Sequence, residues 1–188
     1  MFYRKTKQAN RNIIRRLEIR KRRETRLDKF ISKGIVRGAR FMDFGTRFNY
    51  YKVAPKALDR VWELELYTRS AELDKKLKEL IKVRVSQING CSFCLDMHTK
   101  AAKKLKATDE ELQQLETWRE SDLFSSKEKM AFELAEKVTL ISEHGVSDEL
   151  YNRVREHYDE KEYVDLIMVI NQINLWNRLA ISMGHSVK

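Results

Sequence analysis

The chain has 188 residues, 42% of them hydrophobic and 35% charged, a composition that fits one globular domain and is too short to argue for two. One proline and six glycines leave few residues that break helices, which favours long helices over many short strands. No apolar run approaches the roughly 20 residues of a membrane span, and the N-terminus lacks the apolar stretch of a signal peptide. A cytoplasmic protein is therefore predicted.

Positive charge is concentrated at the N-terminus. The formal net charge is +10, but residues 1–40 alone contain fifteen Lys or Arg and three acidic residues, a net charge of +12. The remaining residues contain 23 basic and 25 acidic side chains, a net charge of −2. The high net charge therefore describes a basic leader, predicted over 1–41, and does not indicate a nucleic-acid-binding body.

Three interpretations of this leader are open. It is a solvated or disordered tail, or its central part over 12–30 forms a basic helix that binds nucleic acid or anionic membrane. The third interpretation is that translation begins at Met42, which directly precedes a domain predicted over 42–188. Codons for Arg37-Gly38 that resemble a ribosome-binding site would fit this start.

The first half of the domain predicts three helices from its apolar spacing. Pro55 suits the first turn of a helix, because its missing N–H has no partner there in any case. Asn89-Gly90 separates the second helix from the third. The predicted helices cover about 55–69, 73–88 and 91–105.

Later helix starts carry a Ser/Thr/Asp-x-x-Glu pattern, in which the two side chains satisfy free backbone amides at the helix N-terminus. Gly145 is predicted to end the helix that begins after Ser125. The last helix, predicted over 161–182, is apolar on nearly all sides and must be covered by its own fold or by another subunit. No segment has a convincing strand pattern, so an all-α fold is predicted. The capping pairs are Thr108–Glu111, Ser125–Glu128 and Asp159–Glu162.

The chemistry is expected at the only two cysteines, Cys91 and Cys94. A lone Cys-x-x-Cys in a chain without an export signal is usually redox-active or metal-binding. A helix that begins near Cys91 places Cys94 and His98 on the same face as Cys91. Free amides and the helix dipole favour a thiolate at this end, and a second thiol can capture a sulfenic acid as a disulfide. His98 can stabilise the thiolate or relay a proton.

Two alternatives to redox chemistry are open. Cys91, Cys94 and His98 offer three zinc ligands, with water or another chain supplying the fourth, because His144, His157 and His185 are isolated in the sequence. The cysteines can also be buried structural residues at helical spacing.

A longer pattern surrounds the cysteines: Glu79, eleven residues, Cys91-x-x-Cys94, three residues, His98. This spacing resembles the motif of the AhpD-like alkylhydroperoxidases of the carboxymuconolactone decarboxylase superfamily. Segments 86–90, 95–98 and 173–178 are also similar to that family, and the resemblance covers about 42–188. Glu79 by itself would be interpreted as a solvated helix residue among lysines, so its place in a site depends on the spacing.

The resemblance implies an AhpD-like helical bundle that acts as a thiol-dependent peroxidase without a bound metal or cofactor. It assigns Cys94 as the residue attacked by hydroperoxide, Cys91 as the resolving residue, and Glu79 and His98 as a proton relay. The substrate would be an organic hydroperoxide or hydrogen peroxide. Electrons would come from the dithiol of a thioredoxin-like or lipoyl-bearing protein, and the family forms homo-trimers or hexamers.

One residue departs from the family pattern. The best-known members have a histidine immediately before the second cysteine, where this chain has Phe93. Without this histidine the proton relay from Glu79 to the thiols lacks its middle group, and peroxidase turnover would be slow. The alternative function is therefore a protein disulfide reductase or an oxidant sensor. The intact Cys-x-x-Cys argues against lactone decarboxylation, which does not rely on paired cysteines. Asn174, Trp176 and Asn177 also look typical of the family, and core packing is predicted for them.

Overall fold

A computed structural model describes residues 47–185 of the chain. All regular secondary structure in this part is helical, which confirms the predicted all-α fold. The basic leader, its predicted helix and the hypothesis of a start at Met42 concern residues outside the described part. In chain order the elements are α3 (Tyr50–Val53), α4 (Pro55–Ser70), α5 (Lys75–Ile88), α6 (Ser92–Lys104), α7 (Asp109–Gln114), the 3₁₀ turn η2 (Leu115–Thr117), α8 (Ser126–Thr139), α9 (Ile141–His144), α10 (Asp148–Arg155) and α11 (Glu160–Met183).

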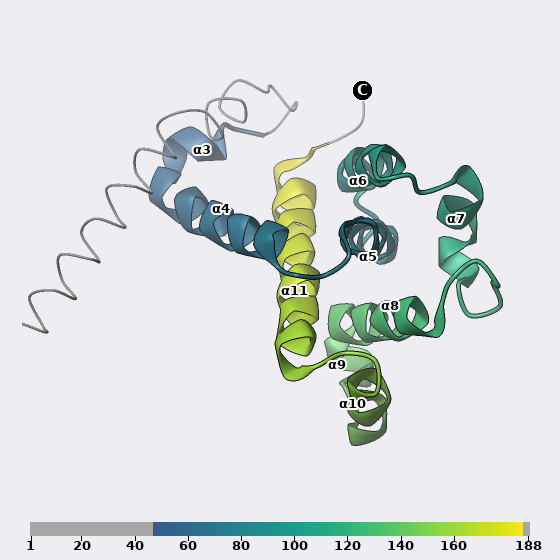
Figure 1. The fold of residues 1–188 in the computed structure, drawn as a ribbon. Helices are drawn as coiled ribbons and strands as arrows, with labels where there is room; N and C mark the ends of the chain where they lie inside the picture. The colour runs from purple at the N-terminus through teal and green to yellow at the C-terminus, as the bar shows by residue number, and fades with distance from the viewer. Residues whose placement is uncertain (1–46, 186–188) are drawn as a thin grey trace, which may run out of the picture. The chain divides into compact units, whose positions relative to one another are not determined.

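The last helix, α11, lies among the other long helices. It packs against α4 on one side and against α5, α6 and α8 on others, as Figure 1 shows. This arrangement explains its nearly continuous apolar sequence, since Leu166, Val169 and Ile170 are fully buried by the fold itself. Val164 and Ile181 stay exposed, at 46% and 47% of their surface.

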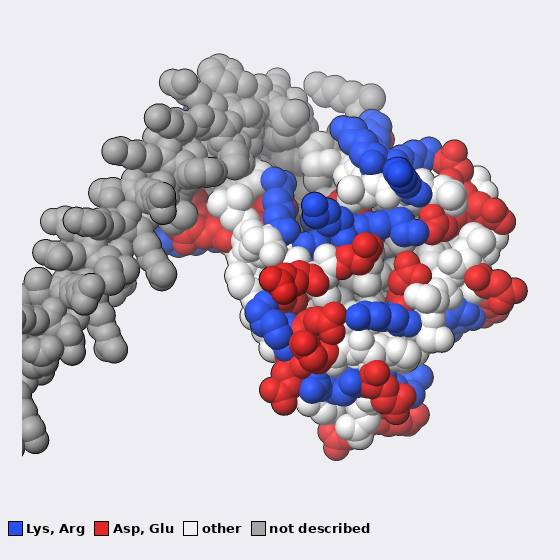
Figure 2. Space-filling view, viewed as in Figure 1, with Lys and Arg blue, Asp and Glu red and all other residues white. Residues whose placement is uncertain are grey.

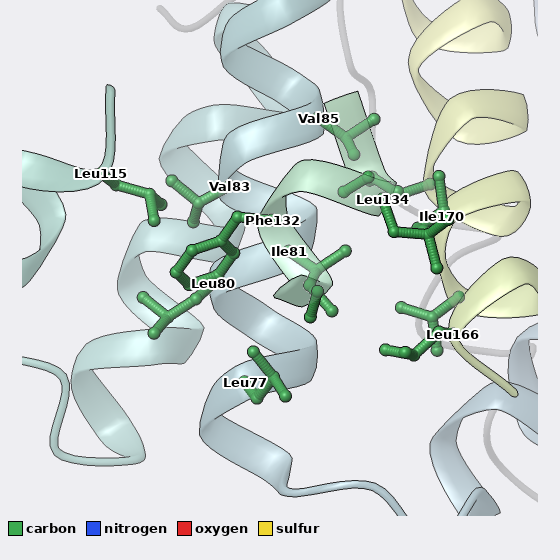
Figure 3. Close-up of a cluster of buried hydrophobic side chains, with 14 of the residues drawn as sticks. Leu77, Leu80, Ile81, Val83, Val85, Leu115, Phe132, Leu134, Leu166 and Ile170 are labelled. Carbon is green, nitrogen blue, oxygen red and sulfur yellow. The ribbon is translucent and has the colours of Figure 1, made fainter. Parts of the chain in front are cut away.

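The core forms where α5, α8 and α11 meet (Figure 3). Burying one large apolar side chain contributes about 1.5–3 kcal/mol, so this cluster supplies much of the driving force for folding. Helix α5 is buried on several sides, and its buried residues include the charged Lys78 and Lys82. The main side chains of the cluster are Leu77, Leu80, Ile81, Val83 and Val85 of α5, Phe132 and Leu134 of α8, and Leu166 and Ile170 of α11.

The helix starts predicted from capping patterns are confirmed. Each of the three predicted pairs forms both of its reciprocal hydrogen bonds, at the N-termini of α7, α8 and α11. Helix α4 begins at Pro55, and the side chain of Asp74 caps α5 by accepting a hydrogen bond from the backbone N–H of Leu77. The local sequence therefore fixes most helix boundaries around the site.

The prediction that one helix runs from Ser125 to Gly145 is wrong. Helix α8 ends at Thr139, and Leu140 has a non-helical backbone, with φ −102° and ψ 42°. The short α9 follows and ends at Gly145, whose φ of +62° favours glycine. Helix α10 was not predicted, because its N-cap Ser147 is followed three residues later by Leu150, so the reciprocal glutamate is missing.

Acidic and basic side chains are interspersed over the face shown in Figure 2, as expected for a body with almost no net charge. No helix within 47–185 combines the length and the apolar character that crossing a bilayer requires.

Candidate active site

A tight turn between α5 and α6 places the two cysteines. Gly90 has a φ of +67°, and a Cβ added there would meet nothing within 4 Å, so the backbone conformation is what favours glycine. The N–H of Cys91 then donates to the carbonyl of Ser86 at 3.0 Å, and Cys91 becomes the N-cap of α6. Cys94 follows one turn later, with its Sγ 2.7 Å from that of Cys91. Both are free thiols, each only 2% exposed.

The paired thiols differ in how easily they ionise. A hydrogen bond from the Cys94 thiol lowers the pKa of Cys91 to about 7 against the opposing effect of burial, and the backbone N–H of Cys94 adds to the lowering. The same contact, together with burial, raises the pKa of Cys94. The contact between the sulfur atoms therefore favours Cys91 over Cys94 as the thiol that loses the first proton. The assignment of Cys94 as the attacked residue stays a prediction.

A buried amide from α11 supports the thiols. Asn177 is completely buried, and its Nδ2 donates to Ser86 Oγ at 3.1 Å while its Oδ1 accepts from Asn89 at 2.9 Å. A hydrogen bond from this side chain also lowers the pKa of both cysteines. The packing role predicted for Asn177 is thus incomplete, because its amide joins the turn, α11 and the sulfur atoms.

Asn174 and Trp176, for which core packing was also predicted, form hydrogen bonds with polar partners as well. Asn174 accepts from Asn89 at 2.9 Å and donates to Thr139 Oγ1 at 3.1 Å. The indole N–H of Trp176 donates to Glu65 Oε2 at 3.1 Å. Sequence spacing gives no sign of these partners, since they lie on other helices.

The predicted relay pair, Glu79 and His98, is in direct contact between α5 and α6. Nδ1 of His98 lies 2.7 Å from Oε2 of Glu79, and their side chains are 10% and 15% exposed. Burial raises the pKa of Glu79, but the hydrogen bond from His98 and the charge of Lys82 outweigh it and bring the pKa to about 2. An ionised carboxylate only accepts, so Nδ1 of His98 carries the proton. Glu79 is not the solvated helix residue that its lysine neighbours suggest.

Two further charged residues adjoin this pair and were missed by sequence reasoning. Nζ of Lys82 lies 2.9 Å from Glu79 Oε1 and 3.9 Å from Glu65 Oε1. Glu65 also accepts from Nε of Arg69 at 2.8 Å. Lys82 has the i,i+3 spacing of an ordinary surface ion pair, and Glu65 comes from another helix, so no pattern reveals that both are buried.

The aromatic surroundings of the thiols include a histidine that is isolated in the sequence. The half-buried ring of Phe93 packs edge-on against His185, with centroids 5.0 Å apart, and the ring of His185 lies 5.8 Å from that of Tyr50. Burial, with smaller contributions from Tyr51 and Cys94, raises the pKa of Tyr50, so its phenol stays protonated near the thiols. His185 therefore lies against Phe93, the residue that stands where the family pattern has a histidine.

The geometry gives no support to a zinc site. Within 47–185 no three His, Cys, Asp or Glu side chains converge as ligands for one metal ion, Cys91, Cys94 and His98 included. A cavity of about 550 Å³ lies between α8 and α11, lined by Val138, Asn174 and Arg178 among others, and its lining includes neither cysteine nor His98.

The chain is similar in sequence to a known family and to known proteins. Residues 53–137 match the sequence profile described as the Carboxymuconolactone decarboxylase family. The uncharacterized protein YdfG of Bacillus subtilis is 50% identical over 139 residues, which cover 74% of this chain and 95% of that protein.

Solved structures share the fold. A protein of unknown function from Agrobacterium tumefaciens, assigned to antioxidant defence as an AhpD, is 36% identical, with a TM-score of 0.72 over 76% of this chain and 99% of that one. The debrominase Bmp8 is 16% identical, with a TM-score of 0.63 over 73% of this chain and 74% of that one, a likeness of fold alone. From the family match, the B. subtilis relative and the A. tumefaciens structure, the chain belongs to the carboxymuconolactone decarboxylase family and is one of its AhpD-like members.

Proposed function

We propose that this chain is a thiol-dependent peroxidase that reduces an organic hydroperoxide or hydrogen peroxide and cycles through a Cys91–Cys94 disulfide. The observation that carries the proposal is the 2.7 Å contact between two free thiols at the N-terminus of α6. One of these thiols has its pKa lowered to about 7, so a thiolate is populated at neutral pH.

The cycle balances with a dithiol as the reductant. The Cys94 thiolate attacks the distal oxygen of the hydroperoxide, the O–O bond breaks, and the alkoxide takes a proton and leaves as an alcohol. Cys91 then attacks the sulfenic sulfur, an S–S bond forms, and the oxygen leaves as water after taking a proton. A thioredoxin-like or lipoyl-bearing dithiol reduces the disulfide by exchange and is itself oxidised to a disulfide.

Two separate contacts can carry protons in this cycle, one between the thiols and one between His98 and Glu79. In the reduced pair the charge rests on Cys91, so transfer of the Cys94 proton across the 2.7 Å contact precedes attack. His98 lies one helical turn after Cys94, and its Nδ1 is held by Glu79, which leaves Nε2 to exchange protons with the leaving oxygen.

A second candidate function is protein disulfide reduction or oxidant sensing. It is favoured by Phe93, which cannot relay protons, and by the lowered pKa of Cys91, which suits thiol–disulfide exchange near neutral pH. A homo-trimer or hexamer also remains a proposal for this chain.

Trapping of the oxidised intermediates tests the assignment. One equivalent of cumene hydroperoxide should convert the wild type to a Cys91–Cys94 disulfide, read by mass spectrometry of its peptides. In Cys91→Ser, a dimedone adduct should form on Cys94, while Cys94→Ser should give much less adduct. An adduct confined to Cys91 would reverse the two roles, and a wild type that forms no disulfide would contradict the peroxidase.

A further inference from the structure

A row of alternating charges runs from α4 through α5 to α6. Arg69 contacts Glu65, Glu65 faces Lys82, Lys82 contacts Glu79, and Glu79 contacts His98. The separations of 2.8, 3.9, 2.9 and 2.7 Å leave no gap in the row. It ends one helical turn from Cys94, on the same helix.

The middle of this row is buried. The side chains of Glu65 and Lys82 are each only 7% exposed. Buried charges lose their hydration, and apolar residues of similar volume often stabilise a protein at least as well. Stability alone is therefore a weak reason for a lysine and two carboxylates at this place, which points to their effect on the neighbouring Glu79–His98 pair.

We propose that Lys82, held in place by Glu65, is a positioning residue that keeps Glu79 ionised and aims Oε2 of Glu79 at His98. Lys82 occupies Oε1 of Glu79, so only Oε2 faces the imidazole. His98 then keeps its proton on Nδ1 and presents Nε2 to the thiol side. This inference rests on the proposed peroxidase function and adds a residue that the Glu79, Cys-x-x-Cys, His98 motif does not contain.

Lys82 is the lysine that contacts Glu79, because the neighbouring basic side chains are engaged with other groups. Within the described residues the ion-pair partners of Glu79 are Lys82 and His98. From α4, Arg69 is engaged with Glu65. On α5, the buried Nζ of Lys78 donates to backbone carbonyls at the end of α4, at 2.7–3.2 Å.

Further charges of α5 and α11 act on Lys78. Lys75 opposes the charge of Lys78, whereas Asp165 of α11 and Glu79 favour it. None of these groups replaces the hydrogen bond that Lys82 donates to Glu79. Without Lys82, burial acts on Glu79 with only His98 in contact, so the carboxyl group takes up a proton at higher pH.

The substitution Lys82→Met tests this, with Lys82→Arg as the conservative variant. Lys76→Met is the matched control, because Lys76 lies on the same helix but pairs with Glu111. One readout is the tautomer of His98, from ¹⁵N NMR of the full chain. The other is the pH at which Glu79 takes up its proton, from ¹³C NMR of its carboxyl group. A purely structural lysine would change the melting temperature but neither of these.

In the wild type and in Lys76→Met, His98 should hold the Nδ1–H tautomer. In Lys82→Met it should become a mixture, and Glu79 should take up its proton about one pH unit higher than in the wild type. Lys82→Arg should restore both. If Lys82→Met does not fold, Glu65→Gln must move both readouts in the same direction.

A folded Lys82→Met, or in its place a Glu65→Gln, with the wild-type His98 tautomer and the wild-type Glu79 titration would overturn the positioning role. The tautomer also separates the two proposals. A wild type without turnover whose His98 tautomer still depends on Lys82 would contradict the peroxidase and leave the role of Lys82 standing.

Discussion

Nδ1 of His98 lies 2.7 Å from Oε2 of Glu79, although the two are nineteen positions apart along the chain. The contact crosses from α5 to α6 and needs no residue between its partners. Phe93 therefore does not interrupt the contact between Glu79 and His98, because His98 reaches Glu79 directly. Phe93 instead affects proton transfer between the Glu79–His98 pair and the sulfur atoms, because its ring cannot carry a proton.

Replacing Glu79 tests the electrostatics of the pair through stability. The folded-state pKa of Glu79 is about 2, below its ordinary 4.5, so its ionisation stabilises the fold above about pH 4.5. This contribution is lost as the pH falls from about 4.5 towards 2. Glu79→Gln should lower the free energy of unfolding by about 1–3 kcal/mol at pH 7 and by clearly less at pH 3.

Urea unfolding at the two pH values measures the difference. Glu120→Gln, on an exposed turn, is the control and should change the free energy of unfolding by less than about 0.5 kcal/mol at both. An equal loss at pH 7 and pH 3 in Glu79→Gln would mean that the substitution acts through packing instead of charge.

Asn177 offers a test of how the thiolate is stabilised. Asn177→Asp keeps the shape of the side chain but replaces the donor that faces the thiols by an acceptor with negative charge. The pKa of Cys91 should rise from about 7, and the rate of alkylation by iodoacetamide at pH 7 should fall about tenfold. The rate is followed from pH 5 to 10, because a change in thiol access would lower it equally at every pH. An unchanged pKa of Cys91 would show that Asn177 does not stabilise the thiolate.

Phe93→His supplies the histidine that other family members have at this position. A proton-transferring group beside Cys94 should raise peroxide turnover at pH 7 by about tenfold or more, because general acid–base catalysis typically contributes at least that much. Phe93→Leu removes the same ring and adds no such group, so it should not raise the rate. Turnover in Phe93→His that stays at the wild-type level would show that the step next to the thiols is not limited by a missing proton carrier.

The fold was predictable to a large extent because local signals set it. The capping pairs at Thr108, Ser125 and Asp159, and the break at Asn89-Gly90, lie within a few residues of the boundaries they determine. The interruption at Leu140 could not be predicted, since neither glycine nor proline marks it. There the chain leaves the helix at an apolar residue, and tertiary packing decides where.

The candidate site was predictable only along a single stretch of chain. Glu79, Cys91, Cys94 and His98 lie within twenty residues, and helical spacing places the last three along one face of the same helix. Glu65 of α4 is hydrogen-bonded to Trp176, which lies 111 positions further along the chain. Asn177 of α11 is hydrogen-bonded to Ser86, which lies 91 positions before it. Spacing carries no information over such separations, so buried polar partners from other helices appear only in the structure.

The most direct test of the central claim is consumption of cumene hydroperoxide by the full chain with a dithiol reductant, beside Cys94→Ser and Cys91→Ser. The proposed cycle requires repeated turnover in the wild type and its loss in both variants, with a single burst of about one equivalent in Cys91→Ser, where the sulfenic acid cannot be resolved. No turnover by a wild type whose two thiols are free and reactive would contradict the peroxidase. The site would then be assigned to disulfide exchange or oxidant sensing.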